Sequence, residues 1–110
     1  MLNGARKKPL RAPMIIAVIA KVTPDVPGVP KFEQVLSAGC AAHGILLAAH
    51  AQGFGAMWRT GKYAFDPVVN KGLGLAEDDE LVGFLYLGTL GGRHKPVAAH
   101  ATADFVERWN

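Results

Sequence analysis

The chain has 110 residues, of which 50% are apolar and 19% are charged, so a packed core is expected and intrinsic disorder is excluded. The net charge of +3 includes a basic run from Arg6 to Arg11, which could contact nucleic acid or an acidic membrane through phosphates. Because no aromatic residue is interleaved with this run, we favour a solvated lead-in over residues 1–13, with no nucleic acid and no membrane as partner. The length predicts a single domain, with a core over 14–89 and an arm over 90–110.

Two apolar segments fill the first half of the chain. Residues 14–22 form a β-branched run that predicts a strand covered on both faces. Three prolines and a glycine make residues 23–30 a loop. From Lys31 the sequence predicts a long helix that runs to about Gln52 and is ended by Gly53 in a left-handed conformation. Its uncharged stretch is short for a membrane span and contains polar side chains, so we expect a buried core helix.

The second half of the chain predicts two further strands around a short helix. Residues 54–61 are typical of a short strand or an extended segment, and residues 81–87 of an apolar strand. Between them, Asp66 can cap a helix over residues 68–73, because a proline follows it at the first helical position. The acidic run over residues 77–80 is expected to be a solvated loop, which we favour over a metal site built from its carboxylates.

This order of elements indicates an α/β or α+β fold, in which the long helix could serve as a crossover between parallel strands. The sequence offers no second helix layer large enough to cover the other face of the sheet. We therefore expect a partial domain or an obligate oligomer.

The cysteine and histidine residues offer no standard catalytic arrangement. Cys40 could act as a nucleophile if His43, on the same helical face, served as its base, but a small buried thiol is the favoured interpretation. His43 and His50 could line a pocket or an interface, although ordinary core or interface histidines are favoured. The chain has neither a GxxxxGKS/T loop nor a GxGxxG fingerprint, and the histidine spacing predicts no metal site. We assign no catalytic residue.

The glycine-rich segment from Gln52 to Gly61 carries the most chemical information. Its glycines allow the backbone to lie against a flat ligand, and the N–H groups of Thr60 and Gly61 could donate to electronegative ring atoms. Trp58 offers an aromatic wall, and Arg59 offers a planar cation for an anionic or phosphorylated group. A glycine-rich turn with a packed tryptophan and an exposed arginine explains the composition equally well.

Several motifs in register give the chain a resemblance to a known family. They are, in chain order, Lys8-Pro-Leu-Arg-Ala-Pro-Met-Ile-Ile16, Ser37-Ala-Gly-Cys-Ala41, Ala48-Ala-His-Ala-Gln-Gly-Phe-Gly55, Met57-Trp-Arg-Thr-Gly61 and Val82-Gly-Phe-Leu-Tyr-Leu-Gly-Thr89. In order and spacing these motifs resemble the small single-domain nitroreductases, over nearly all of the chain up to Thr89. The resemblance implies an α+β, nitroreductase-like sheet with a long buried central helix, here lacking the N-terminal helical part.

The resemblance also implies a function and a set of binding residues. Members of this family bind FMN at a homodimer interface, take a hydride from NADH or NADPH onto the flavin, and pass electrons to nitroaromatic or quinone-like small molecules. By the same resemblance we expect a cytoplasmic homodimer. The residues that match the family's FMN-contacting positions are Trp58, Arg59, Thr60, Gly61 and Arg93, and those that match its NAD(P)-contacting stretch are Ala48, Ala49, His50, Ala51, Gln52 and Gly53.

The sequence departs from the family pattern at the phosphate-binding positions. The family's Arg-Arg-Ser-type segment, which grips the FMN phosphate, and a second ring-contacting stretch do not occur in this sequence. Gly91 stands where the family usually has a basic residue, and Thr60 stands where it usually has serine. We therefore expect a truncated form of the enzyme, and the alternative is a non-catalytic, dimerising remnant with weak or no flavin binding.

Overall fold

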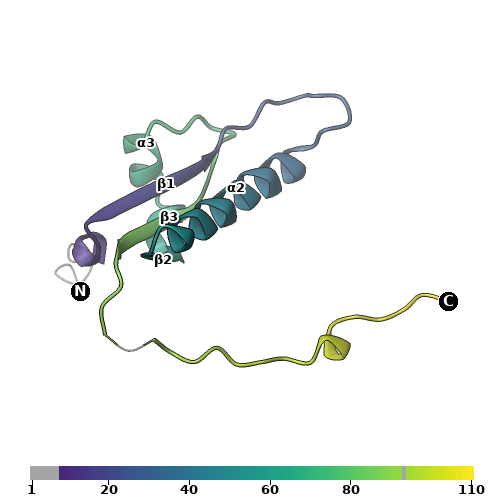
Figure 1. The fold of residues 1–110 in the computed structure, drawn as a ribbon. Coiled ribbons are helices and arrows are strands. Elements are labelled where there is room, and N and C mark those ends of the chain that lie inside the picture. The colour runs from purple at the N-terminus through teal and green to yellow at the C-terminus, as the bar shows by residue number, and fades with distance from the viewer. Residues whose placement is uncertain (1–7, 93) are drawn as a thin grey trace.

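The computed structural model describes residues 8–92 and 94–110, and it shows a small α+β arrangement of one antiparallel sheet and one long helix (Figure 1). The elements in chain order are η1 (Lys8–Arg11), β1 (Met14–Ala20), α2 (Lys31–Ala51), β2 (Phe54–Arg59), η2 (Lys62–Phe65), α3 (Pro67–Gly72), β3 (Glu80–Thr89) and η3 (Thr102–Asp104). The first residues of the predicted basic run, and Arg93, lie outside the described residues.

Over the described residues the sheet has three strands in the order β1-β3-β2, and both outer strands pair antiparallel with β3. Leu85 at the centre of β3 lies between Ile16 of β1 and Trp58 of β2. The outer strands therefore run in the same direction but are not neighbours. The expected crossover is α2, which carries the chain from one edge of the sheet to the other, while β3 inserts between the two strands that α2 connects. No pair of described strands is parallel.

The long helix begins and ends where the sequence predicts. Pro30 stands in extended conformation before the first turn, and Gly53 follows the last turn with a φ of 85°. A left-handed glycine at this position is a common helix stop because it lacks the steric cost of a Cβ atom. With 21 residues, α2 is long and apolar enough to cross a membrane by length and composition, a criterion that core helices of soluble proteins also meet.

The expectation that α2 is buried is wrong for the described chain. The helix contacts all three strands, but only Ala42 and Ala49 along its length are buried. Phe32 is 70% exposed and Leu47 is 58% exposed, because the helix packs on the sheet through one narrow stripe. Cys40 is also exposed, so the expected buried thiol is wrong for the same reason.

The hydrophobic core is centred on β3. Leu85 has no exposed surface, and Leu81 on the same strand is buried as well. By contrast, Ile15 to Ile19 of β1 are only half-buried, so the prediction of a strand covered on both faces is wrong. The physical reason is the position of β1 at an edge of a sheet with a helix packed along one face, which is typical of antiparallel sheets.

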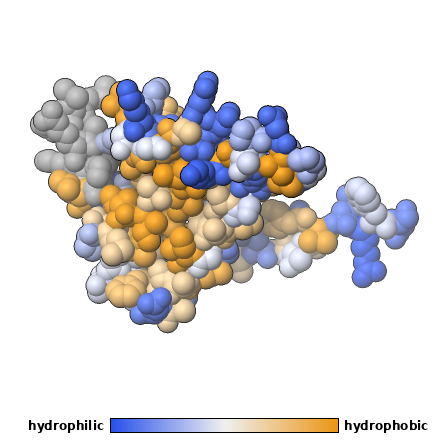
Figure 2. All heavy atoms as spheres, turned by 90° about the horizontal axis from the view of Figure 1, so that it is seen from above, coloured by the Kyte–Doolittle hydropathy of each residue, from blue (hydrophilic) through white to orange (hydrophobic). Residues whose placement is uncertain are grey.

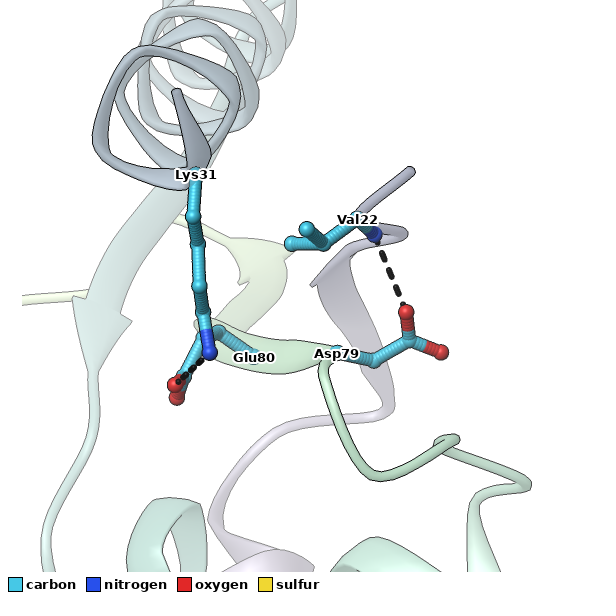
Figure 3. A network of polar contacts seen from close by, with 4 residues as sticks. All are labelled: Val22, Lys31, Asp79 and Glu80. Atoms are coloured by element: carbon cyan, nitrogen blue, oxygen red, sulfur yellow. Dashed lines mark hydrogen bonds and ion pairs between the residues drawn. The ribbon is translucent and has the colours of Figure 1, made fainter. Parts of the chain in front are cut away.

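Polar contacts of the acidic run fix the connections around the sheet (Figure 3). The Asp79 carboxylate accepts hydrogen bonds from the N–H groups of Val22, at 3.0 Å, and Ala76, at 2.9 Å. Glu80 forms an ion pair of 3.0 Å with Lys31 in the first turn of α2. The run is thus not simply a solvated loop, because two of its carboxylates bind the end of β1, the α3–β3 connection and the start of α2.

The backbone donors also affect the charge state of Asp79. The N–H groups of Ala76 and Val22 lower the pKa of Asp79 below its ordinary value of 3.8, and desolvation opposes them only in part. The positive charges of Lys21 and Lys31 act in the same direction as the N–H groups. These donors therefore favour the ionised carboxylate.

The short helix α3 has the cap that the sequence predicts. Asp66 Oδ1 accepts hydrogen bonds from the N–H groups of Val68, at 2.8 Å, and Val69, at 3.4 Å. Pro67 occupies the first helical position, where its missing N–H group costs nothing. Gly74, with a φ of 82°, turns the chain after the helix. This helix and η2 lie in contact with each other, and η2 contacts β3.

The C-terminal segment, from Leu90 onward, extends away from the sheet and helix (Figure 1). All of its described residues are exposed, including Trp109 at 97%. The radius of gyration is 17.2 Å, whereas a compact chain of this length would have about 13 Å. One ring contact is present within the segment, between His100 and Phe105, with the centroids 5.9 Å apart.

Candidate functional site

The glycine-rich segment forms the end of β2, an edge strand of the sheet. Trp58 lies on the face of the sheet that packs against α2, and its Nε1–H donates to the carbonyl of Val82 at 3.3 Å. The far edge of the indole reaches Gly39 of α2, where a Cβ atom would be 3.8 Å from Cη2. Trp58 is 36% exposed. The ring is therefore held between β3 and α2 and still presents part of its surface to solvent.

The Arg59 side chain points to the opposite face of β2 from Trp58, because successive side chains of a strand alternate. Arg59 is exposed, and its Nε–H donates to Sδ of Met57 at 3.0 Å. A flat ligand lying on one face of the sheet can therefore contact only one of these two side chains. The sequence predicted that Trp58 and Arg59 contact the same ligand. Both side chains can do so only if the ligand lies at the open edge of β2, where the two faces of the sheet meet.

The two residues after β2 are suited to backbone contacts. The ladder with β3 ends at Arg59, so Thr60 and Gly61 leave the sheet. Within the described chain, neither N–H group donates a hydrogen bond to another protein group. Gly61 adopts φ 61° and ψ −164°, a conformation almost restricted to glycine, and a Cβ atom there would meet open space. Two N–H donors beside an exposed indole are therefore available to a ligand.

The residues from Ala48 to Gly53 form the last turn of α2 and its stop. Ala48, Ala49 and Gln52 of this stretch line a cavity of about 430 Å³ between α2 and the sheet. The other lining residues are Pro13, Met14, Ile45, Phe54, Leu87, Gly88 and Thr89. None of the described residues that line the cavity is charged, and the polar side chains of Gln52 and Thr89 are exceptions in an apolar wall. His50 and Ala51 are exposed and do not line it.

The two candidate segments lie at opposite ends of β2. One ends at Gly53, directly before the strand, and the other begins at Trp58 near its last residue. The strand has six residues, so at about 3.3 Å per residue the two segments are separated by roughly 17 Å. The structure therefore brings together the members of each predicted set but does not bring the two sets to one point within a single chain.

Among the described residues, neither the cysteine nor any histidine lines the cavity, although His50 belongs to the stretch from Ala48 to Gly53. Cys40 and His43 are both exposed on α2, as is His50, so the expectation of core histidines is wrong for the described chain. An interface position remains compatible with this exposure. Among residues 8–92 and 94–110, no group of three or more histidine, cysteine, aspartate or glutamate side chains could hold a metal ion.

Sequence reasoning missed two glycines that shape this site. Gly39 and Gly83 border the Trp58 indole from α2 and β3. A glycine inside an apolar strand, as at Gly83, often marks a close approach of another group, so this signal was present in the sequence. The predicted contact from Arg93 lies outside the described residues.

Comparison with known proteins finds relatives that carry the name nitroreductase. The family described as "Nitroreductase family" matches residues 1–89. The chain is 50% identical over 88 residues to "Putative NAD(P)H nitroreductase YdjA" of Escherichia coli K12, covering 80% of this chain and 48% of that protein. It is 44% identical over 79 residues to "Putative NAD(P)H nitroreductase" of Haemophilus influenzae, covering 72% of this chain and 43% of that protein. The chain thus spans about half the length of the curated relatives it matches.

A solved structure supports the fold. The structure of "the Nitroreductase-like Family Protein from Bacillus cereus" superposes with a TM-score of 0.77 at 20% sequence identity. The match covers 96% of this chain and 59% of that chain. At this identity the likeness concerns the fold alone.

Proposed function

Because the chain belongs to the nitroreductase family, we propose that it serves as an FMN-dependent NAD(P)H oxidoreductase, with nitroaromatic or quinone-like molecules as acceptors. The observation that carries the proposal is the end of β2, where a fixed indole and two unused N–H donors adjoin the open edge of the sheet. By the resemblance in sequence, this segment corresponds to the family's flavin-contacting residues. We also propose a cytoplasmic location, as for the family.

The residues at this end of β2 fit a flavin in their chemistry. The Thr60 and Gly61 N–H groups can donate to the electronegative atoms of the ring, and Gly61 has no side chain to obstruct its approach. The exposed flank of Trp58 offers an apolar surface, while the exposed guanidinium of Arg59 suits an anionic group. When bound, FMN supplies the two-electron chemistry that the amino acids lack. The chain's own contribution is to bind and orient it.

The last turn of α2 is our candidate for the nicotinamide nucleotide. The cavity beside Ala48, Ala49 and Gln52 is apolar, so it suits an uncharged aromatic ring better than a phosphate. The Gln52 amide and the Thr89 hydroxyl offer both hydrogen-bond donors and acceptors at its wall. Both NADH and NADPH are compatible with these groups. The two nucleotides differ by a phosphate on the adenosine ribose, and neither the Gln52 amide nor the Thr89 hydroxyl selects for or against it.

We further propose that the active form is a homodimer with the flavin at the interface. Hydride transfer needs reacting atoms about 3–3.5 Å apart, whereas the two candidate segments of one chain are separated by the length of β2. A site shared between two copies could bring the segments of different copies together. The exposed, apolar outer side of α2 is a suitable contact surface, because a second copy packed on it would remove its apolar side chains from water.

The outer side of α2 also has the spacing of a helix seam. Its exposed small residues recur at alternating intervals of four and three, which keeps them on one stripe and lets two backbones approach closely. These residues are Ser37, Ala41, Gly44, Ala48 and Ala51, of which Ala48 also lines the cavity between α2 and the sheet. In the view of Figure 2, apolar residues gather over one part of the surface and hydrophilic residues over another, while the C-terminal segment projects beyond them.

A second candidate function is a dimerising protein with weak or no flavin binding. It is favoured by Gly91, which stands where the family usually has a basic residue and so offers no charge to a phosphate. Each lost charge-assisted hydrogen bond to phosphate would remove about 1.5–3 kcal/mol of binding free energy.

The proposal is tested by a turnover assay on the purified chain. With added FMN, we expect oxidation of NADH or NADPH that depends on a quinone or nitroaromatic acceptor and rises with protein concentration. The matched control is free FMN without protein. If the chain dimerises but adds nothing to the rate of free FMN, the second candidate function replaces the first.

A further inference from the structure

Gly83 lies in the middle of β3, and the indole of Trp58 occupies the space where its side chain would be. An added Cβ atom at Gly83 would overlap Nε1 of Trp58 and lie 2.7 Å from its Cδ1. Gly83 is buried, although glycine has no side chain of its own to bury. The closest neighbours of this position are therefore the atoms of one aromatic ring.

The same position also controls the backbone of β2. The third nearest atom to the added Cβ is the carbonyl oxygen of Arg59, at 3.2 Å. A side chain at Gly83 would therefore press on the indole and on the strand that carries it, both belonging to the segment from Trp58 to Gly61. Displacement of either would move the two N–H donors that follow the strand.

Backbone conformation does not explain the glycine. Five described glycines have positive φ, namely Gly28, Gly53, Gly61, Gly74 and Gly92, and Gly83 is not among them. An alanine could adopt the backbone conformation of Gly83, since β-strand dihedrals suit all L-residues. The requirement at Gly83 is space.

The indole is restrained from three sides. The Val82 carbonyl accepts its N–H, Gly83 supports the ring edge near Nε1, and Gly39 of α2 borders the far edge at Cη2. Two of these three neighbours lack a side chain, so the ring fits a slot formed by β3 and α2. Because Trp58 directly precedes Arg59 and Thr60, a fixed ring also fixes the start of the candidate flavin segment.

We propose that Gly83 is a positioning residue for flavin binding: it holds the Trp58 indole against β3 and so sets the place of the Trp58–Gly61 segment. The ligand in this statement rests on the proposed function. The contact between Gly83 and Trp58 stands on the geometry alone. Gly83 does not itself touch the flavin; it acts through Trp58 and the end of β2.

The test compares two glycine-to-alanine substitutions, in a Trp109→Phe background that leaves Trp58 as the single tryptophan. Gly83→Ala is the test variant. Gly72→Ala in α3 is the matched control, because its Cβ would meet no atom within 4 Å and Gly72 lines neither candidate site. Trp58 emission reports the ring position, and a titration with FMN reports affinity. Neither readout requires turnover.

For Gly83→Ala we expect an altered Trp58 emission spectrum and an FMN dissociation constant raised about tenfold or more. For Gly72→Ala we expect an unchanged emission spectrum and a dissociation constant within about threefold of the parent. If Gly83→Ala retains both the parent emission and the parent affinity, the proposal is wrong. Equal losses of affinity in the two variants would reduce Gly83 to a general structural role and would also overturn it.

A double variant keeps the proposal testable if Gly83→Ala alone folds poorly. Trp58→Leu removes the ring that the added methyl group would meet. We therefore expect Gly83→Ala to lower the unfolding midpoint strongly in the parent and much less in the Trp58→Leu background. An equal decrease in both backgrounds would show that the indole is not the group in contact.

The outcomes also separate this proposal from the proposed function. If the parent chain does not bind FMN, the positioning role for flavin falls together with the proposed function. The emission spectra and the double variant then still decide whether Gly83 holds the indole.

Discussion

The two sides of α2 differ in what they contact. The inner side places Ala42 and Ala49 against a sheet whose central residue, Leu85, is fully buried. The outer side presents Phe32 and Leu47 with more than half of each side chain exposed. Small residues on the inner side allow the helix to lie close to the strands. The large apolar residues on the outer side contribute little to the stability of the single chain, because they stay exposed to water. The chain thus completes its packing on one side of α2 and leaves the other side exposed, which is where we propose that a second copy packs.

The largest effect on stability should follow from a change in the sheet core that the inner side of α2 covers. Leu85→Ala leaves a cavity at the centre of the core, and we expect a loss of about 2–5 kcal/mol in the free energy of unfolding, measured by urea denaturation. Leu47→Ala on the outer side is the matched control and should cost much less in the monomer, because Leu47 is largely exposed. Similar losses for both variants would break the distinction between the two sides.

A bulky residue on the outer side should prevent association without unfolding the chain. A Cβ at Gly44 meets no atom within 4 Å, so Gly44→Leu is tolerated in the monomer but obstructs a closely packed second copy. We expect the dimer dissociation constant to rise about a hundredfold, measured by sedimentation. Lys71→Leu, which adds the same side chain on α3, should leave association unchanged. A Gly44→Leu protein that dimerises like the parent would exclude the stripe as the seam.

A smaller effect is expected at the end of β2, away from both sides of α2. Arg59→Ala removes an exposed cation held by Met57, so FMN affinity should fall about tenfold while the unfolding midpoint stays constant. Lys62→Ala removes a nearby exposed charge and serves as the control. An unchanged FMN titration for Arg59→Ala would contradict the assignment of its guanidinium to the ligand.

The smallest effect should come from the polar contacts at the start of α2. The folded-state pKa of Asp79 is lowered, so its contribution to stability is present above the unfolded value near 3.8 and is lost as pH falls through the folded value. We expect Asp79→Asn to lower the unfolding midpoint at neutral pH and to reduce its decrease on acidification below about pH 3.8. Asp78→Asn is the control, since it leaves the bonds to Val22 and Ala76 in place. Identical acid dependence in the parent and Asp79→Asn would refute this role.

Sequence patterns predicted the elements better than their packing. Pro30, Gly53 and the Asp66-Pro67 pair each have a local effect on the backbone, so the ends of α2 and the cap of α3 could be placed from the sequence. The insertion of β3 between β1 and β2 could not, because alternation in a strand does not specify its partners. The two sides of α2 are both apolar in sequence, so nothing there indicated which side meets the sheet or that Cys40 would be exposed.

The candidate site was predicted as a segment but not as an arrangement. The Gln52–Gly61 glycines drew attention to β2, and the strand assignment itself implies that Trp58 and Arg59 point to opposite faces. The slot around Trp58 depends on Gly39 and Gly83, which are distant from it in sequence and meet it only through the fold. Spacing along the chain cannot reveal such a contact.

Whether the end of β2 holds FMN is tested most directly by energy transfer from Trp58. In the Trp109→Phe variant, Trp58 is the single tryptophan, and a flavin bound beside it should quench its emission in a saturable titration. We predict quenching that follows the same binding curve as the change in FMN fluorescence. Two results would contradict the assignment of residues 58–61 to the flavin. One is no binding of FMN over the whole titration, and the other is binding that leaves Trp58 emission unchanged.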